Sequence, residues 1–280
     1  MICIIYMKFG HTKTLLLGLA FILILLTCVF YYAREGLETM NYMEGVDVIY
    51  YINLERSNER RTEIETILSD SAFRNIPKHR INATDGKSPT EMYEKLGEYT
   101  KQPNTSDYEY ACLISHLDAI KEFNNSEYKI ALILEDDASL EFKKYWRKSI
   151  NEVIKNAPRD WEVITLYHNC PYDKNFNDNE YETHAYKKYG YALAYVINKN
   201  GANKFISSHI KNNKYDLINT PEHIADVYLY EHIKTYVYKY PFFVMRSNND
   251  SEIHNHHLPN QNVEKNQCVR AYNNIYPSVN

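Results

Sequence analysis

The feature of this sequence that most constrains its fold is an apolar run that leads directly into three carboxylates. Residues 130–134 read Ile-Ala-Leu-Ile-Leu, and Glu135, Asp136 and Asp137 follow them. A continuous apolar run of this length is typical of a strand buried on both faces, as in a parallel sheet. In open α/β sheets, ligands bind beyond the carboxyl ends of the strands, which is where these acids would lie. The stretch therefore predicts an α/β fold with a site at the end of a buried strand.

The three adjacent carboxylates admit two interpretations. They would repel one another unless a cation lies among them, and their hard oxygen atoms suit Mg²⁺ or Mn²⁺. Proteins hold these ions with one or two carboxylates together with substrate phosphates. The alternative is a solvated acidic turn after a core strand, because a motif of three residues is not specific.

Length and charge restrict the class of protein. A chain of 280 residues with 44% hydrophobic and 24% charged residues is long enough for one large globular domain or two small ones. The formal net charge of −4 argues against nucleic acid as a partner, since nucleic-acid-binding proteins usually carry a basic surface. The oligomeric state stays open.

The amino-terminal region contains a candidate membrane anchor. Thr14 to Tyr32 includes no charged residue and is long enough to cross a bilayer as a helix. Lysines precede this run, so the positive-inside rule favours a cytoplasmic amino terminus. A cleaved signal peptide is the alternative, but the apolar core is long and no clear cleavage site follows it. We expect a cytoplasmic segment (1–13), a single-pass anchor (14–32), a stem (33–45) and a lumenal or extracytoplasmic remainder.

Beyond the anchor, apolar segments alternate with helical patterns. Strands are expected at 46–52, 78–82, 130–134, 161–166, 190–197 and 239–246, and helices from about residue 57, at 109–120 and at 202–206. The polar segment 88–108 is expected to form a loop over a site. This alternation predicts a mostly parallel sheet flanked by helices in one domain, residues 46–258, followed by a tail, 259–280.

Several side chains near predicted strand ends could serve a nucleotide ligand. Arginines follow the first strand, and a guanidinium presents a planar set of donors that fits a diphosphate. The alternative is a surface cluster of charges paired with neighbouring glutamates. Asp85, in an Asp-Gly turn, could accept hydrogen bonds from a base or a ribose. A lone histidine on a helix, such as His116, is more often a core or boundary residue than a catalyst.

The order of these motifs resembles glycosyltransferase family 25. The resemblance spans about residues 46–246 and rests on Ile52-Asn53-Leu54 with Arg56 and Arg60, Asp85-Gly86, Glu109 with Cys112, Ser115-His116, and the stretch from Ile133 to Asp137. This family includes bacterial lipooligosaccharide galactosyltransferases and collagen galactosyltransferases. The chain departs from the family pattern at Tyr108 and Ala111, where glycine is usual or frequent.

The resemblance implies a GT-A type of nucleotide-diphosphosugar transferase fold and a metal-dependent, inverting transfer of a hexose. The donor would be a UDP-sugar, with galactose the first guess and glucose the second, and the acceptor a glycan or a hydroxylated protein side chain. It implies donor contacts from Asn53, Arg56, Arg60, Asp85, Ser115 and His116. It also implies Mn²⁺ or Mg²⁺ on Asp137 with Glu135 or Asp136, a late ligand such as His254, and Asp226 as the catalytic base.

Alternatives remain for individual residues and for the whole chain. Asp226 would otherwise be a solvated acid near a helix start, and the histidines around His254 would be either adventitious or hydrogen-bonded to metal ligands rather than ligands themselves. The rival functions are a catalytically inactive adhesion or binding module on the same fold and a metal-dependent phosphohydrolase. The intact acidic triplet argues against the first, and the second would need further Asp and His ligands at several strand ends.

Overall fold

The computed structural model describes residues 18–29, 41–97, 102–168, 179–184, 190–217, 223–246, 266 and 269–270. The chain divides into two compact units, Met1–Asn41 and Tyr42–Asn280. In the first unit, residues 18–29 form an exposed helix, which is the described part of the predicted anchor. Among the described residues, no helix combines the length and the apolar character that crossing a membrane requires. The anchor at 14–32 therefore stays a prediction.

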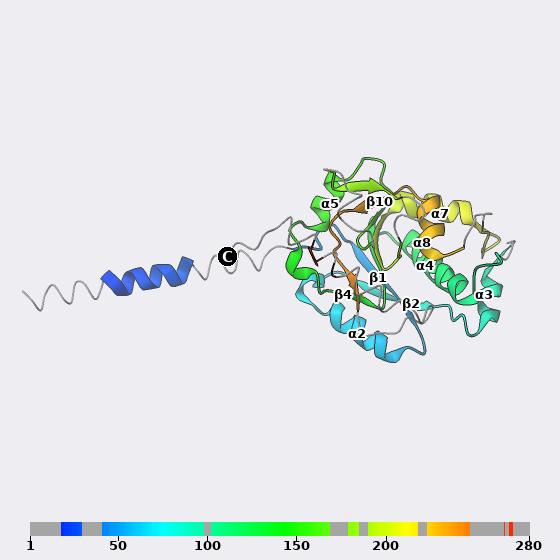
Figure 1. Cartoon of the computed structure of the whole chain (residues 1–280), viewed down its shortest axis with the longest axis horizontal. Coiled ribbons are helices and arrows are strands. Elements are labelled where there is room, and N and C mark those ends of the chain that lie inside the picture. Colours follow the sequence, from blue (N-terminus) through cyan, green and yellow to red (C-terminus); the bar gives the residue numbers. More distant parts are fainter. Residues whose placement is uncertain are drawn as a thin grey trace, which may run out of the picture. The chain divides into compact units, whose positions relative to one another are not determined.

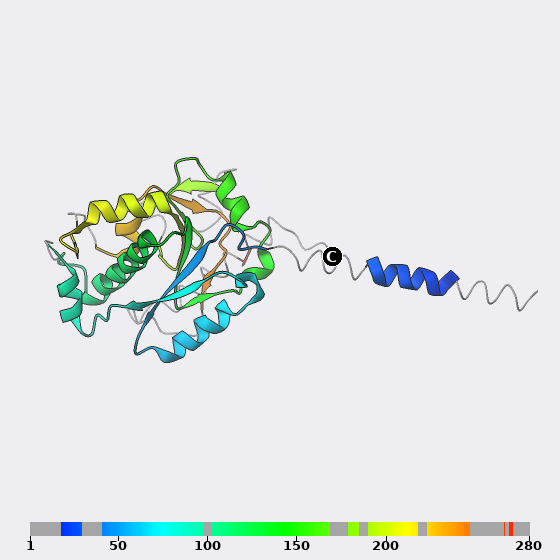
Figure 2. The same ribbon diagram turned by 180° about the vertical axis from the view of Figure 1, so that it is seen from behind.

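The second unit is built on a seven-stranded sheet (Figures 1 and 2). From one edge to the other, its strands are β2 (Lys78–Ala83), β1 (Val48–Leu54), β3 (Ile130–Glu135), β7 (Ala194–Asn198), β5 (Val163–Thr165), β10 (Thr235–Tyr238) and β6 (Tyr181–Thr183). Two small ribbons pair β4 (Ala138–Ser139) with β11 (Val244–Met245), and β8 (Ile210–Lys211) with β9 (Lys214–Tyr215).

The sheet is mixed: β2, β1, β3, β5 and β10 point in one direction, in agreement with the expectation of a mostly parallel sheet, whereas β7 and β6 run in the opposite direction. β1 runs parallel to both β2 and β3, and β5 runs parallel to β10. β7 lies antiparallel to β3 and β5, and β6 lies antiparallel to β10. A strand that is covered on both faces shows the same continuous apolar run in either direction, so its sequence does not reveal the direction.

Helices cover both faces of the sheet and create two cores. One core joins one face of β1 and β3 to α4 (Asp107–Asn125), α7 (Lys199–His209) and α8 (Ala225–His232), with Met92 from α3 (Pro89–Lys95). The other core joins the opposite face to α2 (Asn58–Leu68) and α5 (Ile150–Asn156). Among these helices, α4 packs against α3, α7 and α8 (Figure 1).

The predicted central strand is confirmed as β3. Ala131 and Ile133 belong to the first core, Leu132 and Leu134 belong to the second, and all four side chains are fully buried. Because both faces of β3 are covered, the run contains no polar position until it reaches Glu135 at the end of the strand. The acidic triplet thus begins where the two cores end.

Two predicted segments differ from the structure. The segment 88–108 contains helix α3 and the start of α4, whose capping box pairs Ser106 with Glu109. The amide of Ser106 donates to Glu109 Oε2 over 2.7 Å, so the Ser-x-x-Glu pattern marks the helix start. In the late region, residues 235–238 form β10, and within 239–246 only Val244–Met245 is a strand.

Replacement of Ile133 by alanine tests the role of β3 in the core. Ile133→Ala should lower the free energy of unfolding by about 2–5 kcal/mol, because it leaves a cavity beneath α4, whereas Ile133→Val should lower it by about 0.5–1.5 kcal/mol. Urea denaturation followed by circular dichroism measures both values. Equal, small effects of the two substitutions would contradict the described burial of this side chain.

Candidate functional site

A cavity of about 250 Å³ lies beyond the carboxyl ends of β1, β2 and β3. It is lined by every predicted site residue that the structure describes. These residues are Asn53, Arg56, Arg60, Asp85, Ser115, His116, Glu135, Asp136, Asp137 and Asp226. The predicted ligand His254 lies outside the described residues. The structure therefore gathers around one cavity side chains that are up to 173 positions apart in the sequence, from Asn53 to Asp226.

The register of two parallel strands places the acidic triplet against β1. Ile52 on β1 lies opposite Glu135, the last residue of β3, and the residues that follow them in the chain, Asn53 and Asp136, are close enough to form a hydrogen bond. Asn53 Nδ2 donates a hydrogen bond of 2.7 Å to Asp136 Oδ2. The orientation of Asp136 is thus set by the pairing of the two strands.

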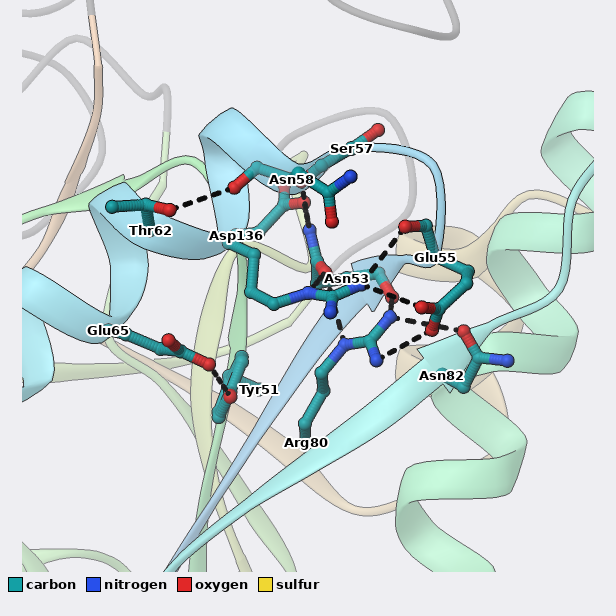
Figure 3. Close-up of polar contacts among 11 residues, drawn as sticks. Tyr51, Asn53, Glu55, Ser57, Asn58, Thr62, Glu65, Arg80, Asn82 and Asp136 are labelled. Atoms are coloured by element: carbon teal, nitrogen blue, oxygen red, sulfur yellow. Dashed lines mark hydrogen bonds and ion pairs between the residues drawn. The ribbon is translucent and has the colours of Figure 1, made fainter.

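The Asn53 side chain uses all of its hydrogen-bonding capacity inside the protein (Figure 3). Its Oδ1 accepts from the Nε atoms of Arg61 and Arg80, each at 3.1 Å, and its Nδ2 also donates to the Ser57 carbonyl at 3.2 Å. A primary amide offers two donors and two acceptor lone pairs. Since Asn53 is also only 1% exposed, its geometry suits the positioning of Asp136 rather than a direct hydrogen bond to a donor nucleotide.

Arg60 balances the charge of two of the carboxylates. Its Nε donates to Asp136 Oδ1 over 2.7 Å, and its Nη2 lies 3.1 Å from Asp137 Oδ2. Burial raises the pKa of both Asp136 and Asp137, while the neighbouring Arg60 opposes the increase. The guanidinium therefore reduces the cost of holding two buried acids next to each other.

One carboxylate oxygen in the site has no hydrogen-bond partner. Among the described residues, Asp137 Oδ1 is buried and unpaired, whereas both oxygens of Asp136 are hydrogen-bonded, one to Arg60 and the other to Asn53. A buried carboxylate oxygen without a donor is costly unless a cation or water satisfies it. The donor set fits a hard divalent cation at Asp137, and Asp136 is the less suited of its two neighbours to share that ion.

Arg56 and Asp85 form an ion pair on the cavity wall. Arg56 Nε lies 2.7 Å from Asp85 Oδ2, and both side chains are about one-third exposed, at 34% and 28%. Burial raises the pKa of Asp85, but hydrogen bonds from Arg56 and from the Lys87 amide outweigh it and leave this pKa below its usual value. Asp85 is therefore ionised and held in position at neutral pH.

Ser115 and His116 connect helix α4 to the strand ends. Ser115 Oγ donates to the Ala111 carbonyl over 2.7 Å and accepts from the Thr84 amide over 3.0 Å, which fixes the segment after β2. His116 Nε2 lies 3.0 Å from Glu135 Oε1, and its Nδ1 lies 3.1 Å from the Tyr195 hydroxyl. The imidazole is fully buried and orients Glu135.

Asp226 enters the cavity from the first turn of α8. Its Oδ2 accepts from the Tyr191 amide over 2.7 Å, and its Oδ1 accepts from the Val227 amide over 3.0 Å. Burial raises the pKa of Asp226, and these backbone hydrogen bonds partly offset the increase. The result is a carboxylate held rigidly on the side of the cavity formed by α8 and Tyr191.

The cavity also has lining residues to which the sequence assigned no role. Tyr108, Cys112, Tyr191, Ile224 and Met245 are the principal ones. The backbone after β11 also contributes, because the Arg246 amide donates to the Asp137 carbonyl over 3.0 Å. The sequence does contain a pattern that places Cys112 at the site. It lies four residues before His116 and is therefore on the same face of a helix. No local pattern pointed to residues 245–246, which approach the site only in the folded chain.

The fold and the cavity define an α/β protein with a carboxylate-containing cavity at the ends of adjacent strands. Residues 46–219 match the family model described as glycosyltransferase family 25 (LPS biosynthesis protein). This match covers more than half of the chain and includes all of the predicted site residues except Asp226 and His254. The chain belongs to glycosyltransferase family 25.

Two curated relatives have the same family description. A glycosyltransferase 25 family member from Anopheles gambiae is 28% identical over 173 residues, which are 56% of this chain and 28% of that protein. One from Drosophila melanogaster is 27% identical over 178 residues, which are 59% of this chain and 28% of that protein. The chain thus matches little more than a quarter of the length of either relative.

Similarity to solved structures is weak. A glycosyltransferase involved in the glycosylation of the major capsid of PBCV-1 gives a TM-score of 0.31 at 10% identity, over 68% of this chain and 92% of that one. The galactosyltransferase LgtC, in complex with donor and acceptor sugar analogues, gives 0.30 at 13% identity, over 57% and 61%. A197 from STIV gives 0.36 at 11% identity, over 71% and 84%. Scores of this size support no conclusion about function.

Replacement of Asn53 tests whether its side chain organises the site. Asn53→Ala removes the partner of Asp136, Arg61 and Arg80 together, and should lower the free energy of unfolding by about 1–3 kcal/mol. Asn82→Ala is the matched control, because exposed Asn82 accepts a single hydrogen bond from Arg80; it should change stability by less than about 0.5 kcal/mol. Urea denaturation measures both, and similar values for the two variants would exclude the organising role.

Proposed function

We propose that this chain is a metal-dependent hexosyltransferase that takes its sugar from a UDP-sugar. The family membership supports the reaction class, and the observation that carries the proposal is the cavity itself. It brings the unpartnered Asp137 oxygen, two arginines and Asp226 together at the ends of three strands. Galactose is the first candidate for the transferred hexose and glucose the second. The acceptor is a glycan or a hydroxylated protein side chain, and the fold is of the GT-A type.

In this proposal, arginines and Asp85 bind the donor. Arg56 is partly exposed on the wall, where its guanidinium can face a diphosphate while Asp85 keeps it oriented. Asp85 can accept hydrogen bonds from a ribose or a base, since its ionised form is favoured. Arg60 supports the same anion by reaching across Asp136 and Asp137.

Asp137, through Oδ1, and Glu135 would hold Mn²⁺ or Mg²⁺, with Asp136 kept in place by Asn53 and Arg60. Such an ion, when bound, offsets the negative charge that develops on the departing diphosphate. His116 contributes by holding Glu135 at the edge of the cavity. A ligand role for His254 stays a prediction from the family resemblance.

Asp226 would activate the acceptor. In an inverting transfer, the acceptor oxygen attacks the anomeric carbon, the bond from that carbon to the diphosphate breaks, and the hydroxyl proton moves to a carboxylate. The amides of Tyr191 and Val227 hold the Asp226 carboxylate in place, and each oxygen retains a second lone pair. The raised pKa of Asp226 makes it a stronger base than an exposed aspartate, which favours proton transfer.

The cellular location is a separate part of the proposal and rests on the sequence alone. The uncharged run from Thr14 to Tyr32 supports an amino-terminal membrane anchor with the catalytic unit on the lumenal or extracytoplasmic side.

A donor-hydrolysis assay tests the proposed function without a known acceptor. The purified chain should release UDP slowly from one member of a UDP-sugar panel, and only when Mn²⁺ or Mg²⁺ is present. Asp137→Asn should reduce this rate by about 100-fold or more, because it weakens the metal ligand. Asp160→Asn is the control, since Asp160 lies outside the cavity and bonds to Tyr236; it should retain the rate.

The outcomes separate the enzyme from the binding module. Release of UDP from one sugar identifies the donor and supports the enzyme. Absence of UDP release from every sugar of the panel, together with no thermal stabilisation by UDP and Mn²⁺, would favour the inactive binding module. An equal rate in Asp137→Asn and the unchanged chain would reject the metal assignment.

Substitution of Asp226 tests the catalytic base. Asp226→Asn should lower kcat by about 100-fold or more while leaving the affinity for UDP and Mn²⁺ unchanged, because the amide cannot take the proton. In the unchanged chain, kcat should fall as the pH drops through the Asp226 pKa, which lies above the ordinary range of an aspartate. Isothermal titration and rate measurements across pH provide both readouts. Parallel losses of binding and turnover would reject the assignment.

A further inference from the structure

A cluster of three potential metal ligands of mixed chemistry lies on the wall of the same cavity. Cys112, His116 and Glu135 each offer one ligand atom, and these atoms all lie within 4.8 Å of one another. Cys112 and His116 are four residues apart on α4 and so lie on one face of the helix, which Glu135 meets from the end of β3. Nothing in the proposed transfer reaction uses the thiol.

The surroundings of His116 suit a metal ligand. A histidine that binds a metal usually has its other ring nitrogen held by a hydrogen-bonding group, which fixes the ring. His116 Nδ1 lies 3.1 Å from the Tyr195 hydroxyl, and its Nε2 points toward Glu135. A tyrosine hydroxyl can either donate or accept. It can therefore hold the imidazole both in the tautomer that donates to Glu135 and in the one that leaves Nε2 open to a cation.

The charges around Cys112 also favour a cation. Burial, and after it the nearby carboxylates of Glu135, Asp226, Asp137 and Glu109, raise the pKa of the Cys112 thiol, so a cation has to displace the thiol proton. The same negative charges attract the cation. Cys112 is half-buried and lines the cavity, so an ion can reach it from that side. Binding would release the thiol proton to solvent and shift the imidazole proton from Nε2 to Nδ1, where the Tyr195 hydroxyl accepts it in a hydrogen bond. The His116–Glu135 hydrogen bond would be replaced by two bonds to the metal.

We propose that Cys112, His116 and Glu135 form a second metal site, one that prefers a borderline ion such as Zn²⁺ and inhibits the enzyme when it is filled. Thiolate and imidazole ligands select Zn²⁺ or Co²⁺ over Mg²⁺ and Mn²⁺, which prefer carboxylates. Three protein ligands with a fourth position open to the cavity match a common arrangement of Zn²⁺. The binding part stands on the cluster alone, and the inhibition part rests on the proposed function.

Inhibition follows from a shared ligand. Glu135 belongs both to this cluster and to the proposed site of Mn²⁺ or Mg²⁺ at Asp137. A Zn²⁺ ion on Cys112 and His116 draws the Glu135 carboxylate toward α4 and away from Asp137. It also adds an ion to the wall of a cavity of only about 250 Å³. Binding of Zn²⁺ to this cluster therefore competes with binding of Mn²⁺ or Mg²⁺ at Asp137. Zn²⁺ should inhibit the enzyme by competition with Mn²⁺.

Cobalt provides a spectroscopic probe of the binding part. In the full chain, Cys3, Cys28, Cys170 and Cys268 are replaced by serine, which leaves Cys112 as the single thiol among the five cysteines. Co²⁺ should then produce a thiolate-to-metal charge-transfer band that saturates at one equivalent. Zn²⁺ should bleach this band, because such sites bind Zn²⁺ more tightly than Co²⁺.

Two variants of the proposed ligands test whether the charge-transfer band comes from a metal site that all three residues form. His116→Gln and Glu135→Gln, made in the single-thiol chain, should each weaken Co²⁺ binding by about 10- to 100-fold. Thermal unfolding of each variant shows whether it remains folded, and one folded variant suffices for the comparison. Absence of the band in the single-thiol chain, or a band with unchanged affinity in the folded ligand variants, would overturn the proposal.

The inhibition part has its own readout in Mn²⁺-dependent UDP release. Zn²⁺ should inhibit the unchanged chain, and Cys112→Ser should raise the Zn²⁺ concentration needed for half-inhibition by about 10- to 100-fold relative to its own uninhibited rate. Cobalt binding by a chain that neither releases UDP nor is stabilised by UDP and Mn²⁺ would reject the proposed function but leave the metal site standing. Zinc binding without inhibition of an active enzyme would overturn the inhibitory role.

Discussion

The hydrogen bond between Asn53 and Asp136 connects the sheet to the site. It forms because β1 and β3 are parallel and in a register that sets Ile52 opposite Glu135. A slip of one residue would turn every side chain of β3 to the other core. The same slip would move Asp136 away from its amide partner. The packing of both cores thus determines where the acids lie. The hydrogen bond from Asn53 then fixes the position of the Asp136 side chain.

Three arginine side chains surround this hydrogen bond and contact its two partners. Arg61 and Arg80 donate to the Asn53 oxygen from outside the cavity, and Arg60 bridges Asp136 and Asp137 at its edge. The Arg60 guanidinium offsets part of the charge of the two buried acids, Asp136 and Asp137. Asp137 Oδ1 is a buried carboxylate oxygen without a hydrogen bond among the described residues, and it is the atom on which the proposed metal chemistry depends.

The sequence was sufficient to predict those elements that a short stretch of residues defines by itself. The strand at β3 was evident from an unbroken apolar run, and the gathering of the site residues followed from strand ends and from a family resemblance. The direction of β7 could not be read, because a strand covered on both faces looks alike in either direction. The late strand was misplaced because residues 235–245 are rich in aromatic and β-branched residues throughout. Pairing in the fold, rather than composition, selects Thr235–Tyr238 for the main sheet.

Strand β3 contributes alternate side chains to both cores, so neither core can come apart while the other stays intact. Its amides should consequently exchange with solvent only when the whole unit unfolds. The carboxylates at its end directly follow this strand. Asp85, in contrast, comes from a connecting segment, and Tyr108 comes from the start of α4. The spacing of the acids is therefore set by the part of the unit that we expect to open last, whereas the position of Asp85 depends on a connecting segment.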